Sequence, residues 1–138
     1  MPLTGDIVYG TGIDANGIAR TPDRKALLIV QSGTGLLFRV DPATGSPGPS
    51  TSERDQRRRA AAGRRRLYAV QNRLNTVAVI RLGRTGRTGR VVERLTDPGF
   101  DVPTTVVAYG NRFHLRNAPF TTPPTPETPY TAVAVPRP

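Results

Sequence analysis

Short apolar runs alternate with glycine- and proline-rich turns along most of the chain. The segment KALLIVQS (25–32) is followed by the turn GTG and then by LLFRVD (36–41), which ends at the turn PATG. Runs of this kind, rich in β-branched and aromatic residues and bounded by Gly, Pro and Asp, are typical of β-strands joined as hairpins. The pattern therefore predicts a β-hairpin over residues 25–41.

The hairpin pattern recurs twice further along the chain. RLYAVQN (66–72) and TVAVIRL (76–82) repeat it, and TTVVAYGNRFHLRNA (104–118) is a fainter third copy, about 40 to 45 residues on. The blades of β-propellers recur at this period. We therefore expect an all-β fold, a partial β-propeller of three blade-like units with three or four strands each, and essentially no helix. After the Pro/Thr-rich connection FTTPPTPETPY, a last strand is expected at TAVAV (131–135).

Composition narrows the class of protein. With 36% apolar residues, 14 Gly and 14 Pro among 138 residues, the chain has the profile of turn-rich β structure or partial disorder. It has no cysteine, which excludes disulfides, thiolate metal sites and a Cys nucleophile. MPLTGDIVYG lacks the basic and apolar regions of a signal peptide, and no apolar run approaches the roughly 20 residues of a membrane span. As written, the chain is expected to be cytoplasmic, with no membrane partner, and export of full-length relatives stays open.

Arginine accounts for nearly all of the positive charge, because Lys25 is the one lysine in a chain of net charge +10. Half of that charge lies in SPGPSTSERDQRRRAAAGRRR (46–66), which contains seven arginines and two acidic residues, Glu53 and Asp55. One hypothesis is an Arg-rich, non-enzymatic module that binds nucleic acid or other polyanions through counterion release. The alternative is a disordered or irregular insert. The cluster has no interleaved aromatic residues, which favours the insert and predicts no specific nucleic-acid partner. The arginines of GRTGRTGR (83–90) are interpreted as incidental to a solvated loop between strands.

A family resemblance is carried by NGIARTPDRKALLIVQSGTGLLFRVDPATG (16–45). It resembles the blade signature of the senescence-marker-protein (regucalcin)/gluconolactonase family of six-bladed β-propellers, and residues 67–82 and 96–130 are similar to its bacterial members. The resemblance implies the C-terminal half of such a propeller. One blade would occupy 1–45, and the remaining blades and Pro-rich tail 67–138. It also implies a divalent metal (Ca²⁺, Mn²⁺ or Zn²⁺) and, as ancestral activity, hydrolysis of a sugar lactone or related ester.

Asn16 is the metal ligand that the resemblance implies, because it occupies the Asn of the family's Asn-Gly-Ile motif. Taken alone, Asn-Gly is a common tight-turn dipeptide. The family draws another ligand from an Asp-Gly motif, which this sequence lacks, so we expect a broken metal site and no catalytic residue. A small-molecule lactone is the expected partner if the site is intact. Gln31, Ser32, Gln71 and Asn72 lie at expected strand ends and are candidates to line a pocket.

The missing Asp-Gly motif belongs just before RLYAVQN, within the arginine-rich stretch. If Asp55–Ala62 are encoded by suitable GC-rich codons, a reading frame shifted by one base gives TNGDGLLL, which is the expected start of a blade. We therefore interpret residues 46–66 as a frame-disrupted stretch.

Two further expectations concern exposed features. Half a propeller leaves strand edges open, which predicts self-association. His114 is the only histidine and lies on the expected strand RFHLRN with no nucleophile motif near it. We interpret His114 as a half-exposed strand residue, in preference to the catalytic base of a Ser/His/Asp hydrolase.

Overall fold

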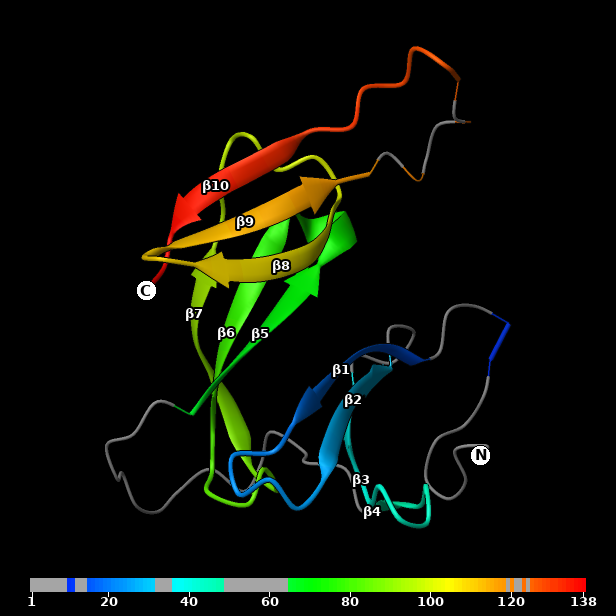
Figure 1. Cartoon of the computed structure of the whole chain (residues 1–138), viewed down its shortest axis with the longest axis vertical. Coiled ribbons are helices and arrows are strands. Elements are labelled where there is room, and N and C mark those ends of the chain that lie inside the picture. The colour runs from blue at the N-terminus through cyan, green and yellow to red at the C-terminus, as the bar shows by residue number, and fades with distance from the viewer. Residues whose placement is uncertain are drawn as a thin grey trace. The chain divides into compact units, whose positions relative to one another are not determined.

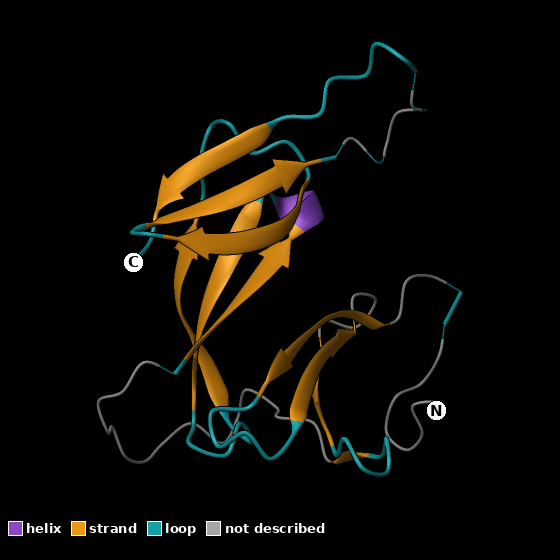
Figure 2. Cartoon of the chain, viewed as in Figure 1, coloured by secondary structure: helices purple, strands orange, loops and turns teal. Residues whose placement is uncertain are grey.

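The described part of the chain consists of strands and turns. The computed structural model describes residues 10–11, 15–31, 36–48, 65–118, 120, 123 and 125–138, and at residues 15–16 and 47–48 it describes the backbone only. Within these residues lie ten β-strands and a single turn of 3₁₀ helix (Figure 2). The prediction of an all-β fold is confirmed. None of the described residues form a helix with the length and apolar character needed to cross a bilayer.

The first sheet is a four-stranded antiparallel meander. Strands β1 (Ala15–Arg20), β2 (Leu27–Gln31), β3 (Leu36–Val40) and β4 (Pro47–Gly48) are neighbours in sequence order (Figure 1). Because side chains alternate between the faces of a strand, the residues of β2 and β3 that share a face gather on one side. They form a core of Ile29, Phe38 and Val40, with Leu27 packed against it. The predicted hairpin over 25–41 is confirmed.

The second sheet has the order β5-β6-β7, again following the sequence. Its strands are β5 (Arg66–Gln71), β6 (Thr76–Leu82) and β7 (Gly89–Leu95). A 3₁₀ turn, η1 (Asn72–Leu74), joins β5 to β6 and ends at Asn75, which is left-handed with φ of 47°. In the central strand β6 four consecutive residues, 76–79, are buried, as is typical of a strand covered on both faces.

The third sheet contains β8 (Pro103–Tyr109), β9 (Arg112–Asn117) and β10 (Ala132–Pro136), with β9 in the middle. Both neighbours of β9 are antiparallel to it. Along β9, Phe113, Leu115 and Asn117 are buried, whereas Arg112 and Arg116 are exposed. This strict alternation is the period-two pattern of a strand with one face on a core.

The chain divides into two compact units. One contains the described residues of Met1–Leu67 together with Arg81–Arg90, and the other contains Tyr68–Ile80 and Val91–Pro138. Strands β5, β6 and β7 contribute residues to both units. The core of the second unit is formed by five buried residues from β6, β9, β10 and the loop before β8, namely Val77, Phe100, Phe113, Leu115 and Val135. The ring of Tyr68 meets that of Phe113 edge to face, with 4.5 Å between their centroids.

The three sheets reproduce the three units that the sequence pattern predicts, with four, three and three strands. Each is a propeller-like meander whose strands follow one another in sequence. Two strands fall inside the predicted insert at 46–66, because β4 occupies residues 47–48 and β5 begins at Arg66. The rest of the insert, 49–64, lies outside the described residues. Residues 83–88 connect β6 to β7, as expected for a loop between strands.

Candidate functional site

Asn16 lies at an irregularity in β1. It is opposite Val30 on β2, while the next residue in register is Ile18, opposite Ile29, so Gly17 is an extra residue on β1. Gly17 has φ of 78°, a left-handed conformation that favours glycine. The Asn-Gly pair therefore forms a β-bulge inside a strand and not a tight turn between strands. Bulges are over-represented beside active sites because they redirect the chain locally.

The search for a metal site around this bulge is confined to the described residues. No group of three His, Cys, Asp or Glu side chains within the described ranges could hold a metal ion. Ala15, the neighbour of Asn16, is opposite Gln31, which is 3% exposed at the end of β2. Ser32 lies outside the described residues, as does the side chain of Asn16. The role of Asn16 as a metal ligand therefore stays a prediction.

Asn72 and Gln71 lie at the corresponding end of β5 and differ in their bonding. The Asn72 amide donates from Nδ2 to the carbonyl oxygen of Pro103 over 2.7 Å, which ties the η1 turn to the start of β8. Asn75 strengthens this link, because its Oδ1 accepts a hydrogen bond from the Val102 N–H at 2.9 Å. Gln71 Oε1, by contrast, is buried with no hydrogen-bond partner. Leaving a buried acceptor unpaired costs about 1–3 kcal/mol, a cost that the bonded amide of Asn72 does not carry.

His114 is half-buried in the middle of β9. Its cross-strand neighbours are Val107 on β8 and Ala134 on β10, both apolar. The imidazole instead meets the ring of Tyr109 edge to face, with 6.3 Å between centroids. These neighbours agree with the interpretation of His114 as a strand residue that packs against an aromatic ring.

The Thr-Pro-Asp turn between β1 and β2 is held by a buried hydroxyl. Thr21 Oγ1 lies 2.5 Å from Asp23 Oδ1 and accepts a hydrogen bond from the Ala26 N–H at 3.1 Å. The Lys25 N–H donates to the same carboxylate oxygen at 3.1 Å. The hydrogen bond from Thr21, followed by that from the Lys25 backbone, lowers the pKa of Asp23 below 3.8, its ordinary value. Asp23 therefore stabilises a turn, and its ionised form is favoured.

One pocket lies in the second unit, away from every residue that the sequence singled out. It has a volume of about 280 Å³ and is lined by the end of β7, the residues after it and the C-terminal residues of the chain. Its charged side chains are Glu93, Asp97 and Arg137. Asp97 already accepts a hydrogen bond from the Gly99 N–H at 2.8 Å. No local motif marks this pocket, because its two walls are about 40 residues apart in sequence.

The identity of the site rests on these residues alone. Comparison of the chain with models of protein families, with curated proteins and with solved structures gives no match.

Proposed function

We propose that the chain is part of a gluconolactonase-like β-propeller protein. Its ancestral activity would be metal-dependent hydrolysis of a sugar lactone or related ester, and this form would be inactive. The observation that supports the proposal is the strand order, since each sheet is an antiparallel meander in sequence order. Propeller blades are four-stranded sheets of this type. The blade signature at 16–45 contains β2, β3 and all but the first residue of β1, which are three of the four strands of the one four-stranded sheet.

The proposed loss of activity rests on the supply of metal ligands. In this proposal Asn16 is the remaining ligand, and its place on a β-bulge favours a role outside simple strand pairing. A Ca²⁺ ion needs six to eight oxygen ligands, most often with carboxylates among them. The sequence has no Asp-Gly pair, and the described residues hold no carboxylate cluster.

The proposal also includes self-association through β8, an edge strand of its sheet. Its residues 104–109, TTVVAY, carry no charge, and Val107 and Tyr109 are 62% and 79% exposed. Exposed edges are normally protected by charges, proline or bulges. The opposite edge, β10, ends in Pro136. The proline and the register irregularity of β8 lie at its start, between Pro103 and Thr105, so the rest of the strand, 105–109, has neither. A second copy can pair with β8 in antiparallel fashion, because one uncharged strand then meets another.

Metal-dependent thermal unfolding tests the proposal. The natural chain is compared with a variant in which residues 55–62 are replaced by TNGDGLLL, each with and without Ca²⁺ or Mn²⁺. We expect no shift in the natural chain and a higher melting temperature with metal in the variant, because a ligand at 100 times its Kd stabilises by about 2.7 kcal/mol. Asn16→Ala in the repaired chain is expected to abolish the shift.

Each part of the proposal has its own contrary result. A metal-dependent shift or lactone hydrolysis by the natural chain would contradict the loss of activity. A repaired chain that does not respond to metal would contradict Asn16 as a ligand. Codons for residues 55–62 that cannot encode TNGDGLLL in another frame would contradict the proposed origin of the arginine-rich stretch.

A further inference from the structure

The connection between β6 and β7 is an ordered turn that carries arginine at every third residue. Arg81, Arg84, Arg87 and Arg90 are all exposed. The turn is closed by two backbone hydrogen bonds, one from the Gly83 N–H to the Thr88 carbonyl oxygen at 2.8 Å and one from the Gly86 N–H to the Gly83 carbonyl oxygen at 3.1 Å. The arginines therefore project from a defined backbone.

The turn is also packed against the first sheet, within the same compact unit. Arg39 Nε on β3 donates a hydrogen bond to the Thr85 carbonyl oxygen at 3.1 Å. Gly86 is buried with φ of 69°, and a Cβ added there would lie 2.8 Å from Thr21 Cγ2 and 3.7 Å from Leu28 Cδ2. Only glycine allows this approach without displacing Thr21. The backbone of the turn thus faces the sheet, and its arginine side chains face solvent.

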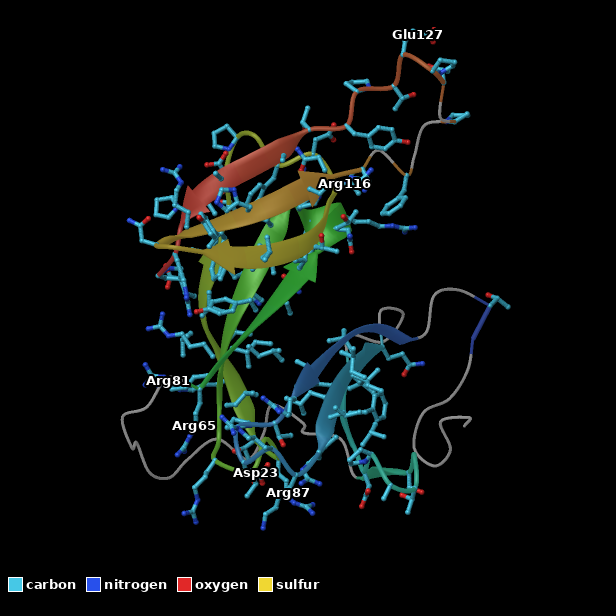
Figure 3. All side chains as sticks on the ribbon, viewed as in Figure 1. Asp23, Arg65, Arg81, Arg87, Arg116 and Glu127 are labelled. Atoms are coloured by element: carbon cyan, nitrogen blue, oxygen red, sulfur yellow. The ribbon has the colours of Figure 1, made fainter. Side chains whose placement is uncertain are left out.

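Further positive charge lies beside the turn. The Leu82 N–H donates to the Arg65 carbonyl oxygen at 2.8 Å, which places Arg65 next to the end of β6, where Arg81 lies. Figure 3 shows Arg65, Arg81 and Arg87 directed away from the ribbon. Arg65, just before β5, and Arg81, near the end of β6, bring two like charges to the same end of these strands, and a bound anion would offset their repulsion.

Acidic residues do not balance this charge within the described part of the first unit. Its carboxylates are those of Asp23 and Asp41, against ten arginine and lysine residues (20, 24, 25, 39, 65, 66, 81, 84, 87 and 90). Asp23 is already bonded to Thr21 and to the Lys25 N–H. The surface formed by Arg65, Arg81, Arg84 and Arg87 is hereafter called the arginine turn.

We propose that the arginine turn binds the phosphate backbone of double-stranded nucleic acid without sequence preference. Guanidinium groups match phosphate oxygens in a bidentate geometry, and each neutralised phosphate releases counterions. The arginines are spread over a strand end and a turn and do not converge on one pocket, which suits a polymer of charges. Residues 81–90 contain no aromatic side chain to stack on unpaired bases, so a duplex is the better fit. The inference does not depend on the proposed lactonase ancestry.

The salt dependence of binding tests the proposal. A labelled mixed-sequence DNA duplex of 20 base pairs is titrated with the whole chain between 50 and 200 mM NaCl, with fluorescence anisotropy as the signal. The test variant is Arg84→Gln/Arg87→Gln. The control is Arg73→Gln/Arg94→Gln, which removes the same charge from two exposed arginines of the second unit. Circular dichroism checks that both variants keep the β structure of the natural chain.

Loss of two phosphate contacts has a defined signature. The slope of log K against log salt should fall in magnitude by roughly 1.8 for the test variant, with affinity at 0.1 M salt reduced by at least about tenfold. The control should keep the slope of the natural chain. Equal effects in the two variants, or no duplex binding by the natural chain at 50 mM salt, would overturn the proposal. So would a test variant that loses binding to phosphatidylserine vesicles while keeping its affinity for the duplex.

Discussion

Replacing Asn117 is expected to destabilise the second unit more than its single side chain suggests. Asn117 ends β9, is 3% exposed, and its amide joins three separate segments. Its Oδ1 accepts from the Asp101 N–H at 3.1 Å, and its Nδ2 donates to the Gly99 carbonyl oxygen at 2.8 Å and to Thr131 Oγ1 at 2.9 Å. The side chain thus connects β9 to the loop before β8 and to the start of β10.

The magnitude follows from the three bonds. A typical hydrogen bond contributes about 1 kcal/mol net. Gly99, Asp101 and Thr131 are exposed, so water can take the place of the Asn117 amide at these groups. The cost of each lost bond should therefore stay near its net value. We therefore expect Asn117→Ala to lower the free energy of unfolding of the second unit by about 3 kcal/mol. Thr131→Val removes one of the three bonds and should cost about 1 kcal/mol.

Urea unfolding followed by tyrosine fluorescence measures the effect, because the chain has no tryptophan and Tyr68 lies against the core of the second unit. With a slope of about 1 kcal/mol per molar urea for so small a unit, the midpoint should fall by about 3 M, or the unit should be unfolded without urea. Asn111→Ala is the control: the residue is exposed in the β8–β9 turn, where substitutions change stability by less than about 0.5 kcal/mol. Equal midpoints for Asn117→Ala and Asn111→Ala would refute the reasoning.

Three other expected outcomes concern the first unit and the edge of the third sheet. Because the pKa of Asp23 is lower in the folded chain, its ionised carboxylate should stabilise the fold fully above pH 3.8, and this stabilisation should be lost as pH falls through the folded pKa. Hydrogen exchange in β2 measures the loss of stability at low pH, and Thr21→Val should make that loss smaller. Gly86→Ala should cost about 2–3 kcal/mol of stability, because the new Cβ adds a close contact with Thr21 to the strain of the left-handed φ. Gly110→Ala should cost about 1 kcal/mol, because its Cβ would meet no atom within 4 Å and only the strain remains. Thermal unfolding compares the two variants, and equal costs would contradict the packing of the turn. Val107→Lys should shift the chain toward monomer in sedimentation velocity while Thr85→Lys does not, and an unchanged distribution would exclude the β8 edge as the contact.

Local pattern was sufficient for the hairpins but not for the features that hold the sheets in register. The runs at 25–41 and 66–82 could be predicted because apolar residues and turn residues lie next to one another in sequence. Strand β1 could not, since Asn-Gly is typical of turns, and its bulge depends on pairing with β2. The three bonds of Asn117 could not be predicted either, because its partners lie 14 to 18 residues away.

The candidate site shows the same division between local and distant signals. Asn16 and Gln71 could be selected from the sequence because each ends or begins a recognisable motif. That Gln71 has an unpaired oxygen while Asn72 is bonded to Pro103 depends on β8, more than 30 residues further on. The sequence does not distinguish these two amides. Only residues far along the chain determine that the Gln71 oxygen is unpaired and that the Asn72 amide is hydrogen-bonded.

The arginines illustrate why composition alone does not assign a role to a charge. The hypothesis of GC-rich codons would apply equally to the arginines of 46–66 and to those of 81–90, since arginine is favoured over lysine in both. Codon usage does not, however, explain why Gly86 is buried against Thr21 or why Arg39 is bonded to Thr85. Those contacts fix the backbone from which Arg84 and Arg87 project. A frame disruption at 46–66 and a functional surface at 81–90 are therefore compatible. The TNGDGLLL replacement tests the first, and Arg84→Gln/Arg87→Gln against the charge-matched Arg73→Gln/Arg94→Gln tests the second.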